Sequence, residues 1–193
     1  MRSAIDPALT IEKLQTMAES QHFDRKSARL AERELARHIS AMANASGGVI
    51  ALGIEDDGTI SGVDDLRENA FRKVPHDLLQ TAPAIQMESL QVDSASKILL
   101  VHISPSTNDV IKRTNGDAFL RVGDSSRQLS AEEIIELEYS KGIRSYESRI
   151  IPDATIDDLD YDLIREYQKA VDVIHEDDPL GLLRARGIIK GTP

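Results

Sequence analysis

Apolar residues recur at helical spacing in several stretches of the chain. The clearest stretch is 30–44, where the apolar positions are Ala31, Leu35, Ile39 and Met42. Their spacings of four, four and three place them on one side of a helix. Gly47 and Gly48 follow soon after, and glycine readily adopts the positive φ of a helix C-cap. The pattern therefore predicts a helix from Leu30 to Asn44.

Weaker helical patterns predict four further helices. They cover 10–19, 66–80 with an interruption near Pro75, 131–141 and 160–174. Thr10 and Thr155 are the expected N-caps of the first and the last of these. The third has a strong start signal, because Ser130 and Glu133 have the spacing of a capping box.

Short apolar runs between the helices are typical of buried strands. Val49–Ile54 precedes the turn residues Asp56-Asp57-Gly58, so we predict a hairpin with 59–63. Further strands are expected at 85–92, at 97–103, and in a second hairpin formed by 110–113 and 118–122. Residues 21–27 are interpreted as a strand or an extended lead-in. The combination predicts an α+β fold with a mixed, mostly antiparallel sheet and flanking helices.

The chain changes character around Pro152. Residues 10–145 contain every predicted strand and are expected to form the main domain. Residues 146–193 contain one long helix and a tail too short to fold alone, so we interpret them as a helical connector. We expect the 193 residues to be the N-terminal part of a longer protein with a further C-terminal domain.

Composition excludes several classes of protein. The chain has no cysteine, which excludes disulfides, thiolate metal sites and a cysteine nucleophile. It has no secretion signal and no apolar run of the roughly 18 residues that a membrane span needs. We therefore expect a cytoplasmic protein without a membrane partner. Neither the phosphate-binding loop of NTPases nor the serine-hydrolase elbow occurs in the sequence.

Positive charge is concentrated near the N-terminus. The net charge is −10, yet the first fifty residues carry seven basic and six acidic side chains, so an anionic partner is expected to prefer them. The candidate contacts are a basic ridge of Lys26, Arg29, Arg33 and Arg37, together with Arg121 and Arg127. The ridge is interpreted either as a phosphate-binding surface or as a solvated helix face paired with neighbouring glutamates.

Acidic residues indicate a second kind of chemistry. In an extended segment, Asp24 and Lys26 point to the same face, and Glu19 can join them across a bend. Such carboxylates could bind a divalent cation, take part in proton transfer, or form an ordinary ion pair. The acidic turn 55–58 is likewise either a plain hairpin turn or part of a site.

Taken in order, several segments resemble one known family. They are Glu19-Ser20, Phe23–Ser27, Ile39–Gly48, Leu52–Gly58, Gly62-Val63 and Ala118–Arg127. Together they resemble the Schlafen-type AlbA-like domain, AlbA_2. The stretch from Ala41–Asn44 to Gly53–Gly58 is the specific part of the resemblance, and 152–160 resembles the connector of bacterial members.

The resemblance implies a DNA-binding module of a bacterial transcriptional regulator. The family has also been labelled ATP-binding, which would make ATP a ligand. In animal Schlafen proteins a related domain cleaves tRNA and rRNA with three acidic residues and a divalent metal. Carried over by motif position, the catalytic and metal-binding acids would be Glu19, Asp24 and one acid of the cluster Glu55-Asp56-Asp57, of which Asp56 is favoured, with Mg²⁺ or Mn²⁺ as the metal.

Three functions therefore compete. The first is a nucleic-acid-binding module, for which DNA is the expected partner, RNA is a second partner, and a homodimer would offset the acidic surface. The second is a metal-dependent endoribonuclease that acts on tRNA or structured RNA. The third is an ATP-binding or dimerisation module. We favour the first, which is not an enzyme.

Overall fold

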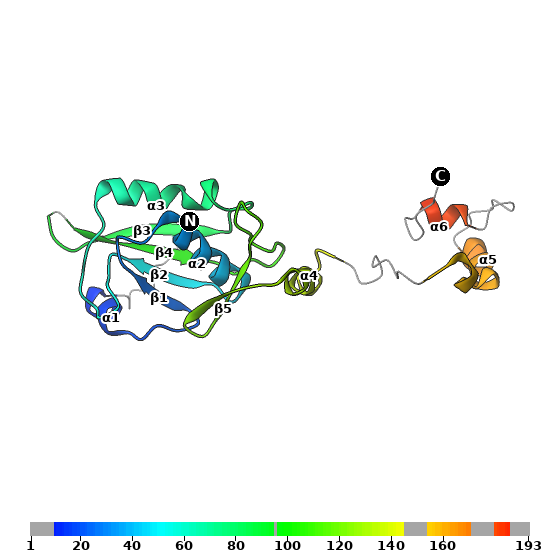
Figure 1. The fold of residues 1–193 in the computed structure, drawn as a ribbon, viewed down its shortest axis with the longest axis horizontal. Coiled ribbons are helices and arrows are strands. Elements are labelled where there is room, and N and C mark those ends of the chain that lie inside the picture. Colours follow the sequence, from blue (N-terminus) through cyan, green and yellow to red (C-terminus); the bar gives the residue numbers. More distant parts are fainter. Residues whose placement is uncertain (1–9, 95, 145–153, 171–179, 186–193) are drawn as a thin grey trace. The chain divides into compact units, whose positions relative to one another are not determined.

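The computed structural model describes residues 10–94, 96–144, 154–170 and 180–185 of the chain. Two compact units are present, Met1–Ile143 and Arg144–Pro193. The helices of the first unit are α1 (Ile11–Thr16), α2 (Glu32–Asn44), α3 (Asp65–Asp77) and α4 (Ala131–Ser140) (Figure 1). Its strands are β1 (Phe23–Lys26), β2 (Gly48–Leu52), β3 (Ile85–Gln91), β4 (Lys97–Ile103), β5 (Phe119–Val122) and β6 (Ser125–Gln128).

Four strands form one mixed sheet in the order β1-β2-β4-β3. β2 lies parallel to β1, with Ile50 opposite Asp24, and antiparallel to β4. β3 and β4 form an antiparallel hairpin, and β5 and β6 form a separate two-stranded ribbon. The predicted α+β fold, with a mixed, mostly antiparallel sheet and flanking helices, is confirmed.

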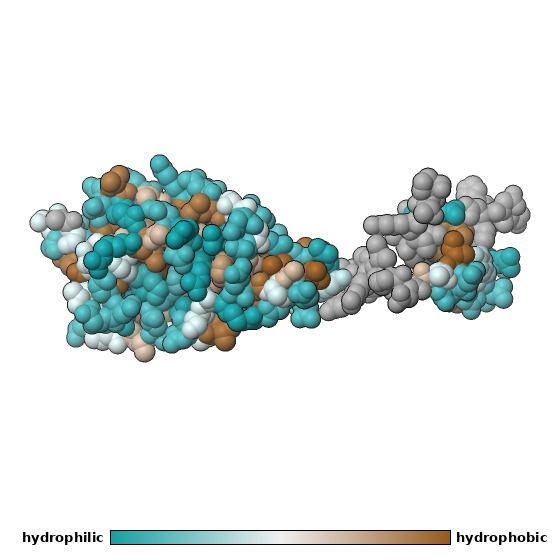
Figure 2. Space-filling model, in the orientation of Figure 1, coloured by the Kyte–Doolittle hydropathy of each residue, from teal (hydrophilic) through white to brown (hydrophobic). Residues whose placement is uncertain are grey.

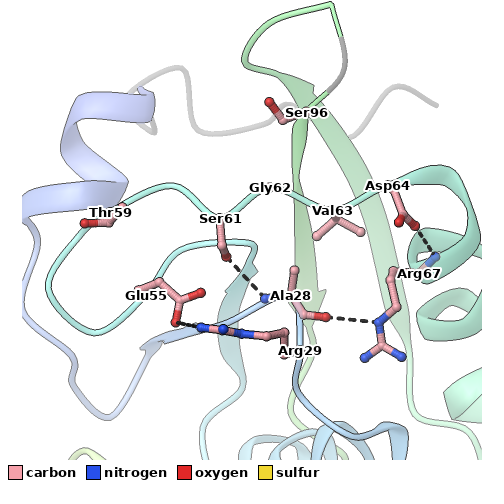
Figure 3. Close-up of a pocket in the computed structure, with 10 residues that line it drawn as sticks. All are labelled: Ala28, Arg29, Glu55, Thr59, Ser61, Gly62, Val63, Asp64, Arg67 and Ser96. Carbon is pink, nitrogen blue, oxygen red and sulfur yellow. Dashed lines mark hydrogen bonds and ion pairs between the residues drawn. The ribbon is translucent and has the colours of Figure 1, made fainter.

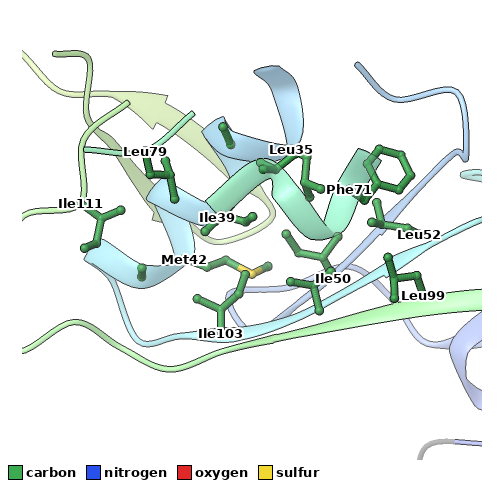
Figure 4. Close-up of a cluster of buried hydrophobic side chains, with 14 of the residues drawn as sticks. Leu35, Ile39, Met42, Ile50, Leu52, Phe71, Leu79, Leu99, Ile103 and Ile111 are labelled. Atoms are coloured by element: carbon green, nitrogen blue, oxygen red, sulfur yellow. The ribbon is translucent and has the colours of Figure 1, made fainter. Parts of the chain in front are cut away.

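Side chains alternate between the two faces of the sheet along β2, and the sheet separates the core into two layers. Ile50 and Leu52 point to the side of α2 and α3, where the larger cluster also includes Leu35, Ile39, Met42 and Phe71 (Figure 4). Ala51 points to the other side, where it packs with Leu14 of α1 and Leu100 of β4. Two helices thus cover one face of the sheet and one short helix packs on the other.

The start of α2 differs from the prediction. The helix begins at Glu32, and Ala31 is its exposed N-cap residue, without a side-chain hydrogen bond. Arg29 therefore precedes the helix and does not belong to its face. Three members of the predicted apolar stripe, Leu35, Ile39 and Met42, are fully buried as expected.

The end of α2 requires glycine for close packing. Gly47 has a φ of 71°, and a Cβ at this position would lie 2.5 Å from the carbonyl oxygen of Ile103. A larger residue would therefore push β4 away from the start of β2. At Gly48 an added Cβ would lie 2.5 Å from the His22 carbonyl oxygen, so close backbone packing explains both glycines without any ligand.

Both predicted hairpins are present as short antiparallel turns with one bridge each. The segment after β2 makes a single bridge, Ile54 to Ile60, because β1 and β4 already occupy both edges of β2. In the second case a single bridge joins Lys112 to Ala118, while β5 pairs with β6 across a tight turn at Gly123, whose φ is 62°. The pattern identified both turns, but it did not indicate that β2 pairs mainly with β1 and β4 or that β5 pairs with β6.

The other predicted helices are present with shorter bounds. Thr10 caps α1, and Ser130 and Glu133 form the predicted capping box of α4. Pro75 does not interrupt α3, since it lies in the last turn and the helix ends two residues later. In the second unit, α5 (Tyr161–Ala170) follows Asp160, whose carboxylate accepts hydrogen bonds from the N–H groups of Asp162 and Leu163. Thr155, the expected N-cap of this helix, instead precedes and caps the short turn 156–158, and 171–174 lie outside the described residues.

The second unit also contains η2 (Ile156–Asp158), a 3₁₀ helix, and α6 (Gly181–Ala185). Ile164 of α5 and Leu183 of α6 are buried, whereas Leu163 is exposed. None of the helices described in either unit has the length and apolarity required to cross a bilayer.

A cluster of charges ties α3 to the sheet. Lys97 Nζ on β4 lies 2.6 Å from a carboxylate oxygen of both Asp65 and Glu68, and Arg72 lies 2.6 Å from Glu68. Hydrogen bonds from Lys97 and Ser89 outweigh desolvation and lower the pKa of Glu68 to about 2. The carboxylate is therefore stabilised in its charged form by folding.

We expect Glu68 to make the stability of the fold depend on pH in acid. Because the pKa of about 2 lies below the ordinary glutamate value, its contribution is complete above the unfolded-state pKa of about 4.3 and is lost as the pH falls toward 2. Urea unfolding measured across this interval should show a smaller loss of stability for Glu68→Gln than for the wild type. Glu12→Gln, on the exposed side of α1, is the control. Parallel curves for Glu68→Gln and the wild type would contradict this role.

Candidate functional site

The site is built around Asp24, a fully buried carboxylate on β1. As predicted, Asp24 and Lys26 point to the same side of the strand, which here is the side of α2. Asp24 Oδ1 accepts a hydrogen bond from Lys26 Nζ at 2.7 Å, and Oδ2 accepts one from Arg121 Nη1 at 2.9 Å. His38 of α2 brings its Nδ1 within 3.2 Å of the same Oδ2. Three elements thus meet at one carboxylate.

These donors keep Asp24 ionised inside the fold. Burial raises the pKa of Asp24, but hydrogen bonds from His38 and Lys26, together with the charge of Lys26, outweigh this effect and bring the pKa below its ordinary value. A buried carboxylate without such partners would be strongly destabilising. The cations around Asp24 are therefore a structural requirement of its position.

Arg121 joins the β5–β6 ribbon to β1. Its Nε and Nη2 donate to the Ser20 carbonyl at 3.2 and 2.9 Å, and Nη2 also lies 3.3 Å from the Phe23 carbonyl. The side chain is 1% exposed. The expectation that Arg121 contacts nucleic acid is therefore corrected, because its donors are directed into the protein.

Two of the three acids predicted as a metal site lie together, and the third does not join them. Glu19 Oε1 accepts hydrogen bonds from Lys26 Nζ at 3.3 Å and from the Arg25 backbone N–H at 3.0 Å, so Lys26 bridges Glu19 and Asp24. Asp56 is exposed in the turn after β2. Within the described part of the chain, no three histidine, aspartate or glutamate side chains are grouped so that they could hold a metal ion. The predicted catalytic and metal-binding set is not assembled, since an ammonium group lies between its first two members.

The trio Ser126, His38 and Asp24 does not form a nucleophilic relay. Ser126 Oγ lies 3.3 Å from His38 Nδ1, the same ring nitrogen that faces Asp24. A serine nucleophile and its orienting carboxylate must bind opposite ring nitrogens of the histidine. The contacts therefore fix α2 against β1 and β6 and do not activate the hydroxyl.

The remaining basic candidates lie at the surface beside acidic side chains. The ion pairs are Arg29–Glu55 at 3.5 Å, Arg33–Glu34 at 3.9 Å, Arg37–Glu34 at 3.2 Å and Arg127–Glu133 at 2.8 Å. The side chains of Arg29 and Arg33 are 84% and 75% exposed. Arg37 is less available, because it donates to the Ser126 carbonyl at 2.7 Å and lies over the Phe119 ring.

A second buried polar cluster holds the segments before and in β5 against the end of α2. Asn44 Nδ2 donates to the carbonyls of Ile111 and Phe119, both at 2.9 Å, and its Oδ1 accepts from the Ile111 N–H at 2.7 Å. Ser40 Oγ donates to the Ile111 carbonyl at 2.7 Å and accepts from the Phe119 N–H at 3.2 Å. Asn44 therefore has a structural role.

Sequence reasoning did not assign His38, Ser40 or Asn44 to these networks. A signal was present for two of them: Ser40 and Asn44 lie four residues apart and flank the apolar residues Ala41, Met42 and Ala43. Polar residues at that spacing share one face of a helix. Where the end of a helix is otherwise apolar, such a pair of polar residues indicates a buried hydrogen-bond partner.

The mixed sheet, with α2 and α3 on one face and a buried Asp24 that contacts Lys26, Arg121 and His38, belongs to an α+β domain. The chain matches the family model described as "Schlafen, AlbA_2" over residues 19–130. The match covers more than half of the chain, which therefore belongs to the Schlafen AlbA_2 family. No curated protein matches the sequence.

Two solved structures are similar to this chain. The DIP2311 protein from Corynebacterium diphtheriae is 22% identical with a TM-score of 0.46, over 86% of this chain and 36% of that chain. The N-terminal domain of a protein from Nitrosomonas europaea, named as related to the ATP-dependent DNA helicase RecG, is 26% identical with a TM-score of 0.43. That match covers 65% of this chain and 92% of the domain. The chain thus spans about a third of the length of the Corynebacterium protein.

Proposed function

We propose that this protein is a DNA-binding module of a transcriptional regulator and that it holds the phosphate backbone with the arginines at the start of α2. The observation that carries the proposal is the exposure of Arg29 and Arg33, whose guanidinium groups extend into solvent. Membership of the Schlafen AlbA_2 family supports a role connected with nucleic acid. Arg37 extends the same side of α2 by one turn.

The acidic partners of these arginines do not prevent phosphate binding. Exposed ion pairs contribute only about 0–1 kcal/mol, and those of Arg29 and Arg33 are long, at 3.5 and 3.9 Å. A DNA phosphate can replace the carboxylate at little cost, and the release of counterions favours the exchange. Most of the described residues on the face of the molecule seen in Figure 2 are hydrophilic.

The net charge of −10 determines how binding should depend on salt. Long-range repulsion between the acidic surface and DNA weakens the complex, so the local phosphate contacts supply the affinity. Each such contact adds about 0.9 to the slope of log K against log salt. Three contacts would therefore give a slope of nearly three.

We expect the triple variant Arg29→Ala/Arg33→Ala/Arg37→Ala to bind duplex DNA about 10- to 100-fold more weakly at low salt and to lose most of its salt dependence. Fluorescence anisotropy between about 50 and 200 mM salt measures both quantities. The control triple Lys73→Ala/Arg165→Ala/Lys169→Ala removes the same charge from exposed positions on α3 and α5. Equal slopes for the two triple variants would remove Arg29, Arg33 and Arg37 from the interface.

A further inference from the structure

A cavity of about 630 Å³, open to solvent, lies beside Arg29 (Figure 3). Its walls come from the turn before α2, the segment after β2 and the start of α3. The side chains that matter for its chemistry are Arg29, Glu55, Thr59, Ser61 and Asp64. A volume of this size lies within the range of about 300–1,000 Å³ that is usual for small-ligand sites. The cavity therefore has room for a group much larger than a phosphate.

The cavity combines one available cation with hydrogen-bond acceptors. Arg29 is 84% exposed, whereas the donors of Arg67 at the opposite end are directed to the Ala28 carbonyl, the Leu30 carbonyl and Glu32. Glu55 accepts a hydrogen bond from Ser27 Oγ at 2.8 Å and lies 3.5 Å from Arg29. Hydrogen bonds from Ser61 and Ser27 lower the pKa of Glu55, so the group is an ionised acceptor at neutral pH.

The lining contains hydroxyl groups but no aromatic ring. Thr59 and Ser61 lie on the same side of the cavity as Glu55 (Figure 3). Without a ring on which a base can stack, affinity for a base must come from hydrogen bonds to its edge. A carboxylate accepts from an exocyclic amino group, as on cytosine N4, and thymine has no such group.

We propose that the cavity receives one unstacked nucleotide of a single DNA strand, with its phosphate on Arg29 and the amino group of its base donating to Glu55. The inference rests on the proposed function, because Arg29 belongs to both sites. In a duplex the bases are stacked and paired, so a duplex engages Arg29 through phosphate alone and leaves the cavity empty. Single strands rich in amino-bearing bases are therefore the preferred ligands of this site.

The test compares oligo(dC), oligo(dT) and a duplex of the same length, about 12 nucleotides, by fluorescence anisotropy at about 50 mM salt. We expect the wild type to bind oligo(dC) about fivefold or more tightly than oligo(dT). Glu55→Ala should tighten the binding of both strands, because it frees Arg29, and should bring their ratio below about twofold, because no acceptor for the amino group remains. Asp77→Ala makes the same change of charge at an exposed position of α3 and should leave the ratio unchanged.

The outcomes separate this inference from the proposed function. Equal binding of oligo(dC) and oligo(dT) by the wild type, or an unchanged ratio in Glu55→Ala, overturns the cavity assignment, even where duplex binding still depends on Arg29, Arg33 and Arg37. Duplex binding that is insensitive to those arginines overturns the proposed function, and a persistent, Glu55-dependent preference for dC would then support the cavity as a separate site. Absence of binding to any of the three ligands overturns both.

Discussion

Replacing Asp24 with alanine is expected to lower the free energy of unfolding by about 3–5 kcal/mol. The substitution removes the carboxylate but leaves Lys26, His38 and Arg121 in place around it, and Arg121 is almost fully buried. A buried guanidinium that has lost its counter-charge costs far more than the ion pair itself contributes. Urea unfolding at neutral pH, followed by circular dichroism, measures the difference.

Asp56→Ala is the matched control for Asp24→Ala. Asp56 is exposed in the turn after β2, so its removal should change stability by no more than about 0.5 kcal/mol. Where Asp24→Ala does not fold, a double-mutant cycle of Asp24→Asn with Arg121→Gln measures the coupling between the two side chains. A coupling energy near zero would show that the contact at 2.9 Å does not contribute to stability.

The parts of the fold that depend on neighbouring residues could be predicted from the sequence. Ser130 and Glu133 are three residues apart, so the capping box of α4 is visible in the sequence alone. The buried positions of α2 likewise follow from helical spacing. Asp24 and Lys26 could be placed on one face, because a strand alternates its side chains whatever it pairs with.

The parts of the fold that depend on partners distant in sequence could not be predicted. Arg121 is 97 residues from Asp24, and nothing in its local pattern distinguishes a buried guanidinium from an exposed one. Both predicted hairpins are limited to one bridge each, because β2 pairs with β1 and β4 and β5 pairs with β6, and the local pattern indicates none of these partners. Arg29 was assigned to a helix face because a spacing of four extends past Ala31, where the helix begins without a side-chain cap.

The candidate site likewise combines features that the sequence could indicate with features that only the fold shows. Basic residue types and their spacing could indicate a surface for anions, but only the fold shows that Arg121 is buried and that Arg29 borders a cavity. The metal hypothesis depended on three acids meeting. Two of them do meet, at Lys26, while Asp56 remains in an exposed turn.

Asn44→Ala is expected to lower the free energy of unfolding by about 2–4 kcal/mol, since each buried polar group left without a partner costs about 1–3 kcal/mol. The Ile111 N–H loses its acceptor at 2.7 Å, and the Phe119 carbonyl loses the Asn44 donor at 2.9 Å. Ser40 compensates in part, because it still donates to the Ile111 carbonyl. Denaturant unfolding measures the loss.

Asn115→Ala is the control for Asn44→Ala. Asn115 lies in an exposed turn, where its amide donates to Asp117, so its removal should cost well under 1 kcal/mol. Hydrogen exchange at the Ile111 amide separates a specific role of Asn44 from a general loss of packing. In Asn44→Ala the Ile111 amide should exchange faster, because its own acceptor has been removed. This increase should be larger than the increase at the amides of β4 and larger than the change in global stability alone would cause. Unchanged relative protection of Ile111 would mean that Asn44 does not hold this segment against α2.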